Sequence, residues 1–100
     1  MYDMKNLDHL KDVAAEAPSI LEAFDRFVTV AVSEGALSRK TKELIAVAVA
    51  HATQCPYCIE YHLREARSLG ATTREIVEAA WVATAIRAGG AFMHMSHLCK

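Results

Sequence analysis

Residues 38–70 read "SRKTKELIAVAVAHATQCPYCIEYHLREARSLG", and this stretch carries the signals that decide the fold. Ser38 is a good N-cap residue, and Pro56 is well suited to the first turn of a helix. Gly70 is a residue that commonly follows the last turn of a helix. The stretch therefore predicts two consecutive helices joined by a short turn, over about 39–53 and about 56–69.

The first of these helices begins charged and becomes apolar all round over Leu44–Ala50. A helix without a polar face is normally buried in the middle of an assembly. This is the longest strongly apolar stretch in the sequence, and it is too short to cross a bilayer, which requires about 20 residues. We therefore expect no membrane partner.

Helix signals continue on both sides of this stretch. Pro18 favours a helix start, Thr72 and Glu75 form the pattern of a capping box, and Gly89-Gly90 should break or kink the chain. Strand signals are absent, because the β-branched residues recur at helical rather than alternating spacing. The sequence predicts an all-α bundle of about five to six helices, of which the further ones cover about 5–16, 18–33, 73–88 and 91–99.

The composition indicates one domain, residues 1–100, with more apolar surface than a short chain can bury. Hydrophobic residues make up 53 % of the 100 residues and charged residues 23 %. Surplus apolar surface of this kind predicts burial between subunits of a homo-oligomer. The net charge of -1 and the lack of a basic run make nucleic acid an unexpected partner. The polar start of the chain lacks a signal-peptide apolar region, which favours a cytoplasmic protein.

Two cysteines lie at the predicted start of the second helix. Because Pro56 places Cys55 at this helix start, unpaired backbone N–H groups and the helix dipole favour its thiolate. Cys58 lies one turn further on, and a pair at this spacing can close a disulfide with little backbone movement. In a cytoplasmic protein such a pair is more often catalytic or metal-binding than structural.

His62 and Glu43 are the expected partners of this dithiol. His62 follows Cys58 by four residues, so the two side chains share a helix face, and the imidazole can accept or return the thiol proton. If the two helices form an antiparallel hairpin turning near Gln54, Glu43 and His62 lie 11 and 8 residues from the turn. At about 1.5 Å per residue this mismatch is only ~4–5 Å. A carboxylate there would orient the imidazole and stabilise its protonated form.

The pattern Glu43-x11-Cys55-Pro-Tyr-Cys58-x3-His62 resembles the AhpD-like alkylhydroperoxidase branch of the carboxymuconolactone decarboxylase superfamily. The resemblance extends over about residues 38–92. It implies an all-α fold, a homo-oligomer that is often a trimer or a hexamer, and thiol-dependent reduction of organic hydroperoxides. Lactone decarboxylation is not expected, because the decarboxylases of the superfamily lack this cysteine pair.

The resemblance also implies roles for four residues. Cys58 attacks the peroxide and becomes a sulfenic acid, Cys55 resolves it to a disulfide, and Glu43 and His62 form a proton relay. A dithiol donor, such as a dihydrolipoyl protein, then regenerates the pair. No cofactor is implied, since the cysteines themselves cycle, and the sequence has no Gly-rich phosphate loop.

The sequence departs from this family pattern in two ways. The full-length peroxidase is a longer, two-lobed chain, whereas this chain corresponds to one lobe, and Tyr57 stands where that peroxidase has a histidine between its cysteines. In addition, the helix-dipole argument favours Cys55 as the more acidic thiol, whereas the family mechanism assigns the attack to Cys58.

Other interpretations of the same residues remain open. A non-enzymatic helical oligomer could hold a structural Cys2His2 zinc ion through His51, Cys55, Cys58 and His62. A dithiol enzyme could instead act on protein disulfides. His51 either lines the same pocket as a secondary site residue or is a hydrogen-bonded residue at a helix end. Tyr57 either contacts the substrate or is an exposed spacer.

Overall fold

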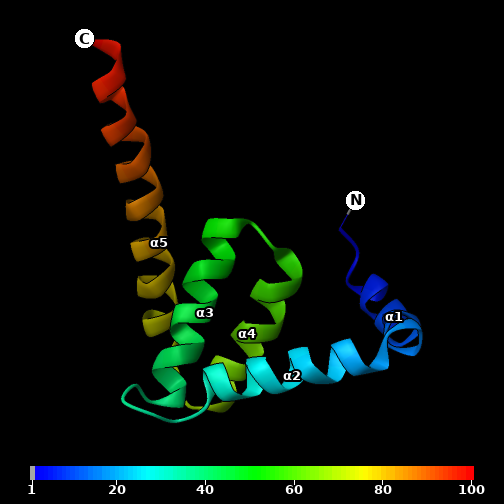
Figure 1. Ribbon diagram of the computed structural model, residues 1–100. Coiled ribbons are helices and arrows are strands. Elements are labelled where there is room, and N and C mark those ends of the chain that lie inside the picture. The colour runs from blue at the N-terminus through cyan, green and yellow to red at the C-terminus, as the bar shows by residue number, and fades with distance from the viewer. Residues whose placement is uncertain (1) are drawn as a thin grey trace.

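The computed structural model describes residues 2–100, and Met1, the first residue of the predicted domain, lies outside the described residues. The described chain is helical throughout and has no strands, which confirms the predicted all-α class (Figure 1). The first predicted helix is divided into a short 3-10 segment and an α-helix. The elements are η1 (Met4–His9), α1 (Leu10–Glu16), α2 (Pro18–Val32), α3 (Arg39–Thr53), α4 (Pro56–Ser68), α5 (Thr73–His94) and η2 (Met95–Leu98).

Helix α3 is the centre of the fold, and α4 and α5 both pack against it (Figure 1). The small core lies where these three helices meet. It is made of apolar side chains only, and its residues are Val47, Ala66, Ala71 and Ile76, with Leu44 and Leu63 partly buried against them. Burial of these side chains from water holds the α3–α4 hairpin against the start of α5.

The turn between α3 and α4 is formed as the sequence predicts. Ser38 caps α3, since its hydroxyl accepts the Thr41 backbone N–H at 3.1 Å. Helix α3 ends at Gln54, whose left-handed backbone (φ 57°) reverses the chain. Cys55 is then the N-cap residue of α4 and Pro56 its first residue. The guanidinium of Arg87 from α5 donates a hydrogen bond to the Ala52 carbonyl and so joins α5 to the end of α3.

Of the predicted break or kink at Gly89-Gly90, the break and the separate helix over about 91–99 are wrong, because α5 continues through both glycines as far as His94. A glycine inside a helix costs only about 1 kcal/mol relative to alanine, which a long helix can tolerate. Helix α5 is also well anchored at its start, where Thr72 and Glu75 form the reciprocal hydrogen bonds of a capping box.

Because α5 is continuous, the described chain contains one helical segment that is as long as a membrane span. Thr73–Leu98 is long and apolar enough to cross a membrane, by length and composition only, and 11 % of its most apolar 18-residue stretch is buried. The expectation that no apolar stretch reaches this length considered only the uninterrupted stretch Leu44–Ala50, and it is wrong in that a longer helix with a few charged residues also reaches this length and mean hydropathy.

The single chain is extended rather than compact. Its radius of gyration is 16.7 Å, whereas a compact chain of this length has about 13 Å. Helices α2 and α5 both reach well beyond the α3–α4 hairpin (Figure 1). The apolar stretch of α3 is not buried all round within one chain, since Ile45 and Val49 are 46 % and 53 % exposed.

Candidate active site

The two cysteines meet at the first turn of α4. The Sγ atom of Cys55 accepts the backbone N–H of Cys58 at 3.3 Å, which makes the Cys55 sulfur the cap of the helix. Both residues are half-buried, and both thiols are free. The arrangement combines unpaired N–H groups at a helix start with a second thiol one turn away.

The hydrogen bonds within this pair give the two thiols different acidities. The Cys58 thiol donates to Cys55, and this hydrogen bond, together with the backbone N–H of Cys58, lowers the pKa of Cys55. The same hydrogen bond raises the pKa of Cys58, and burial raises it further. The lowered pKa of Cys55 and the raised pKa of Cys58 favour Cys55 as the more acidic thiol, in agreement with the helix-dipole argument.

Glu43 and His62 are in contact, as the hairpin argument predicts, and the contact is made within one chain, which the sequence left open. The Nδ1 atom of His62 donates to Oε2 of Glu43 at 2.7 Å. Glu43 is 2 % exposed and the His62 side chain 20 % exposed. A short hydrogen bond to a carboxylate fixes the imidazole orientation and leaves Nε2 as the nitrogen available for chemistry. The ring of Tyr61 meets the imidazole edge-on, with centroids 5.0 Å apart.

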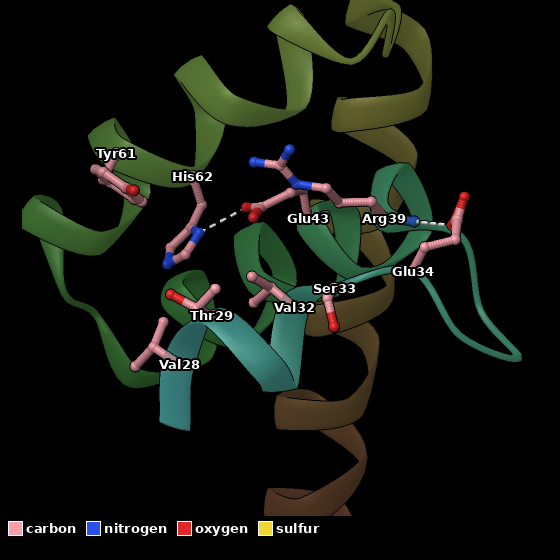
Figure 2. A pocket seen from close by; sticks show the side chains of 9 residues that line it. All are labelled: Val28, Thr29, Val32, Ser33, Glu34, Arg39, Glu43, Tyr61 and His62. Carbon is pink, nitrogen blue, oxygen red and sulfur yellow. Dashed lines mark hydrogen bonds and ion pairs between the residues drawn. The ribbon is translucent and has the colours of Figure 1, made fainter. Parts of the chain in front are cut away.

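A cavity of about 320 Å³ adjoins this pair. It lies between the C-terminal end of α2 and the facing sides of α3 and α4 (Figure 2). Neither cysteine lines it. The wall from α2 consists of Val28, Thr29 and Val32, none of which was a predicted site residue. Their helical spacing predicts an apolar face, but nothing in the sequence says that this face meets His62.

The two secondary candidates make contacts outside this cavity. His51 is exposed, and its Nδ1 donates to the Val47 carbonyl at 2.9 Å, which matches the interpretation as a helix-end residue. The hydroxyl of Tyr57 accepts a hydrogen bond from Asn6 at 3.3 Å, and its ring meets that of Tyr2 with centroids 5.8 Å apart. Tyr57 is thus half-buried under the N-terminal segment rather than an exposed spacer.

The ligand set of the zinc interpretation is not assembled. Across residues 2–100, no three side chains of the types His, Cys, Asp and Glu come together as a metal site would require. The Nδ1 atoms of His51 and His62 are bonded to a backbone carbonyl and to Glu43, so a metal could reach these two rings only through Nε2. A structural zinc site needs four ligands in a tetrahedron, which this arrangement does not offer.

Fold and site together define a small helical protein with a dithiol at a helix start. Residues 18–100 match the model of the carboxymuconolactone decarboxylase family, and the chain belongs to this family. The matched region contains α2 to α5 with both cysteines, whereas η1 and α1 precede it.

Similar proteins come from bacteria and an archaeon. "Uncharacterized protein 4 in cox locus" of Paracoccus denitrificans is 51 % identical over 85 residues, which cover 85 % of this chain and 77 % of the relative. A crystal structure from Methanobacterium thermoautotrophicum is 39 % identical, with a TM-score of 0.84 over 88 % of this chain and 99 % of that one. An apo structure of a carboxymuconolactone decarboxylase family protein from Legionella pneumophila is 35 % identical, with a TM-score of 0.79 over 92 % and 82 % of the two chains.

Proposed function

We propose that this chain is a thiol-dependent peroxidase of the AhpD-like type, which reduces organic hydroperoxides through a Cys55–Cys58 dithiol/disulfide cycle. One observation carries the proposal: the dithiol caps α4, and the same helix bears His62, whose imidazole a buried carboxylate holds in place. An acidic thiol pair and an oriented proton carrier are the groups that peroxide reduction requires.

The proposed cycle balances without a cofactor. A cysteine thiolate attacks the terminal oxygen of R–O–O–H, forms Cys–S–OH and releases R–O⁻, which takes a proton to become R–OH. The second thiol then attacks the sulfenic sulfur, so that a disulfide forms and water leaves. A dithiol donor, for which a dihydrolipoyl protein is our proposal, is oxidised to its own disulfide and returns both protons and electrons to the pair.

We assign the attack to Cys58 and the resolving step to Cys55, with Glu43 and His62 as the relay. The assignment rests on the shared helix face of Cys58 and His62, which lie four residues apart. The hydrogen bond to Cys55 and burial raise the pKa of Cys58, so Cys58 must lose its proton before the attack, and His62 is the acceptor that we propose. The opposite order, with Cys55 attacking, is favoured by the lowered pKa of Cys55 and is the competing assignment.

Trapping of the oxidised cysteines tests both the activity and the order. After treatment with cumene hydroperoxide, mass spectrometry of the wild-type protein should find a Cys55–Cys58 disulfide. A dimedone adduct of sulfenic acid should appear on Cys58 in the Cys55→Ser variant. Cys99, exposed and far along the sequence, is the internal control and should react more slowly.

Three results would contradict parts of this proposal. A dimedone adduct on Cys55 in Cys58→Ser, with none on Cys58 in Cys55→Ser, would reverse the assignment. Equal reaction of all three cysteines would exclude a peroxidase. Rapid reduction of insulin disulfides together with unreactive hydroperoxides would instead identify a dithiol enzyme that acts on proteins.

We further propose that the chain works as a homo-oligomer, a trimer or a hexamer, in which copies of the chain cover each other's apolar helix faces. The extended shape and the exposed apolar residues Phe24, Phe27, Trp81 and Ile86 on α2 and α5 support this. Light scattering should give a mass of about three or six times 11.0 kDa, and Trp81→Glu should lower it. A wild-type mass of 11.0 kDa at micromolar concentration would exclude the oligomer.

A further inference from the structure

The cavity beside His62 has an apolar wall from a helix that carries none of the reacting groups. Helix α2 has only three residues that are not exposed, namely Leu21, Val28 and Val32. The last two lie one turn apart, and together with Thr29 they face the cavity on the side of α2 (Figure 2). Two of the three residues of α2 that are not exposed, Val28 and Val32, therefore line this cavity.

The polar side of the cavity presents an oriented imidazole. The Nδ1 atom of His62 is bonded to Glu43, and Nε2 has no hydrogen-bond partner among residues 2–100. The ring projects into the space between α4 and α2 (Figure 2). A molecule in the cavity would consequently meet a nitrogen that can give or take a proton, opposite an apolar wall.

The charges around the cavity already have partners. The guanidinium of Arg39 pairs with Glu65 at 3.2 Å, and the backbone N–H of Arg39 donates to the Glu34 carboxylate at 2.7 Å. Glu43 is bonded to His62. An anionic molecule would meet the carboxylates of Glu34 and Glu43 and would have to displace Glu65 from Arg39, whereas an uncharged molecule requires no such exchange. The volume of about 320 Å³ is at the lower end of the range for small-molecule pockets.

We infer that this cavity is the alkyl subsite of the proposed peroxidase and that it selects small, uncharged alkyl or aryl hydroperoxides. The inference rests on the function proposed above. Val28 and Val32 contact the hydrocarbon group, which directs the O–O bond towards α4. As the thiolate sulfur bonds to the terminal oxygen and the O–O bond breaks, protonated His62 gives its Nε2 proton to the leaving R–O⁻. Val28 and Val32 are thus specificity-determining residues.

A larger side chain in the cavity tests the binding of the hydrocarbon group separately from the reaction of the cysteines. Val32→Phe should lower kcat/KM for cumene hydroperoxide by about tenfold or more, because a hydrophobic pocket discriminates by this factor on small changes of size. The value for hydrogen peroxide, which has no hydrocarbon group, should stay within about twofold. The matched control is Val30→Phe on the same helix, at a residue that is 65 % exposed and does not line the cavity, and it should change neither value.

A binding measurement decides the subsite even without turnover. Titration of the wild-type protein with cumyl alcohol, the product of cumene hydroperoxide, should shift the methyl NMR signals of Val28 and Val32 and leave those of Val30 in place. If Val32→Phe lowered kcat/KM equally for both peroxides, or for neither, the inference would be overturned. It would also be overturned if cumyl alcohol shifted only the NMR signals of other residues. Absence of wild-type turnover together with the expected shifts would refute the peroxidase and retain the binding site.

Discussion

Replacement of His62 by glutamine should lower kcat/KM for hydroperoxide reduction by about 10²–10⁴-fold, the usual contribution of a general acid–base group. Glutamine can still accept or donate a hydrogen bond, but it cannot carry the proton between the thiol and the leaving oxygen. The loss should appear in the rate of sulfenic acid formation, measured by stopped-flow with dimedone trapping under single-turnover conditions. The resolving step should change much less.

The control for this prediction is His51→Gln. His51 belongs to the end of α3, is exposed, and uses Nδ1 on a backbone carbonyl. Its replacement should change kcat/KM by no more than about threefold, well below the loss that follows removal of a general acid–base group. Equal losses in the two variants would mean that His62 is not the relay, and an unchanged rate in His62→Gln would remove the relay from the proposed cycle.

Replacement of Glu43 should separate the charge of the relay from its hydrogen bond. Glu43→Gln retains an acceptor for the Nδ1–H of His62 but removes the negative charge that stabilises the protonated imidazole. We expect kcat/KM to fall by roughly 10²-fold or more, by analogy with carboxylates that orient a catalytic histidine, with little change in stability. Glu43→Leu also removes the acceptor and should lower the free energy of unfolding by about 1–3 kcal/mol.

Urea unfolding and steady-state kinetics on the same two variants test this separation. Glu60→Gln is the control, because Glu60 is an exposed carboxylate on α4 whose only ion pair among residues 2–100 is with Arg64. Its replacement should affect neither quantity. If Glu43→Gln kept full activity, Glu43 would be a structural partner of His62 and no part of the relay.

The geometry of the dithiol could be predicted from local signals. Pro56 alone predicted a helix start that places Cys55 at the N-cap and Cys58 one turn later, as observed. The left-handed backbone of Gln54 completes the turn and is seen only in the structure. Because side chains in a helix recur at a known rise per residue, the distance of Glu43 from the turn also predicted that it faces His62. The observed Oε2–Nδ1 distance of 2.7 Å confirms this contact.

Two features could not be predicted in the same way. The path of α5 through Gly89-Gly90 depends on how much stability the rest of the helix supplies, which exceeds the cost of two glycines. The cavity depends on where the end of α2 lies relative to His62, and α2 is joined to α3 by a loop rather than by a tight turn.

The sequence by itself determined the helix class, the ends of α3 and α4, the dithiol at the helix start and the hairpin that brings Glu43 to His62. These features depend on capping hydrogen bonds, backbone dihedral preferences and helical spacing, all of which act within a few residues. Only the tertiary structure decided that Glu43 is buried, that Val28 and Val32 face the imidazole across a cavity, and that α5 continues as an exposed apolar helix. The first two features arise from packing between segments far apart in the chain, and no short sequence pattern encodes them. The third depends on whether the rest of α5 supplies more stability than the two glycines cost.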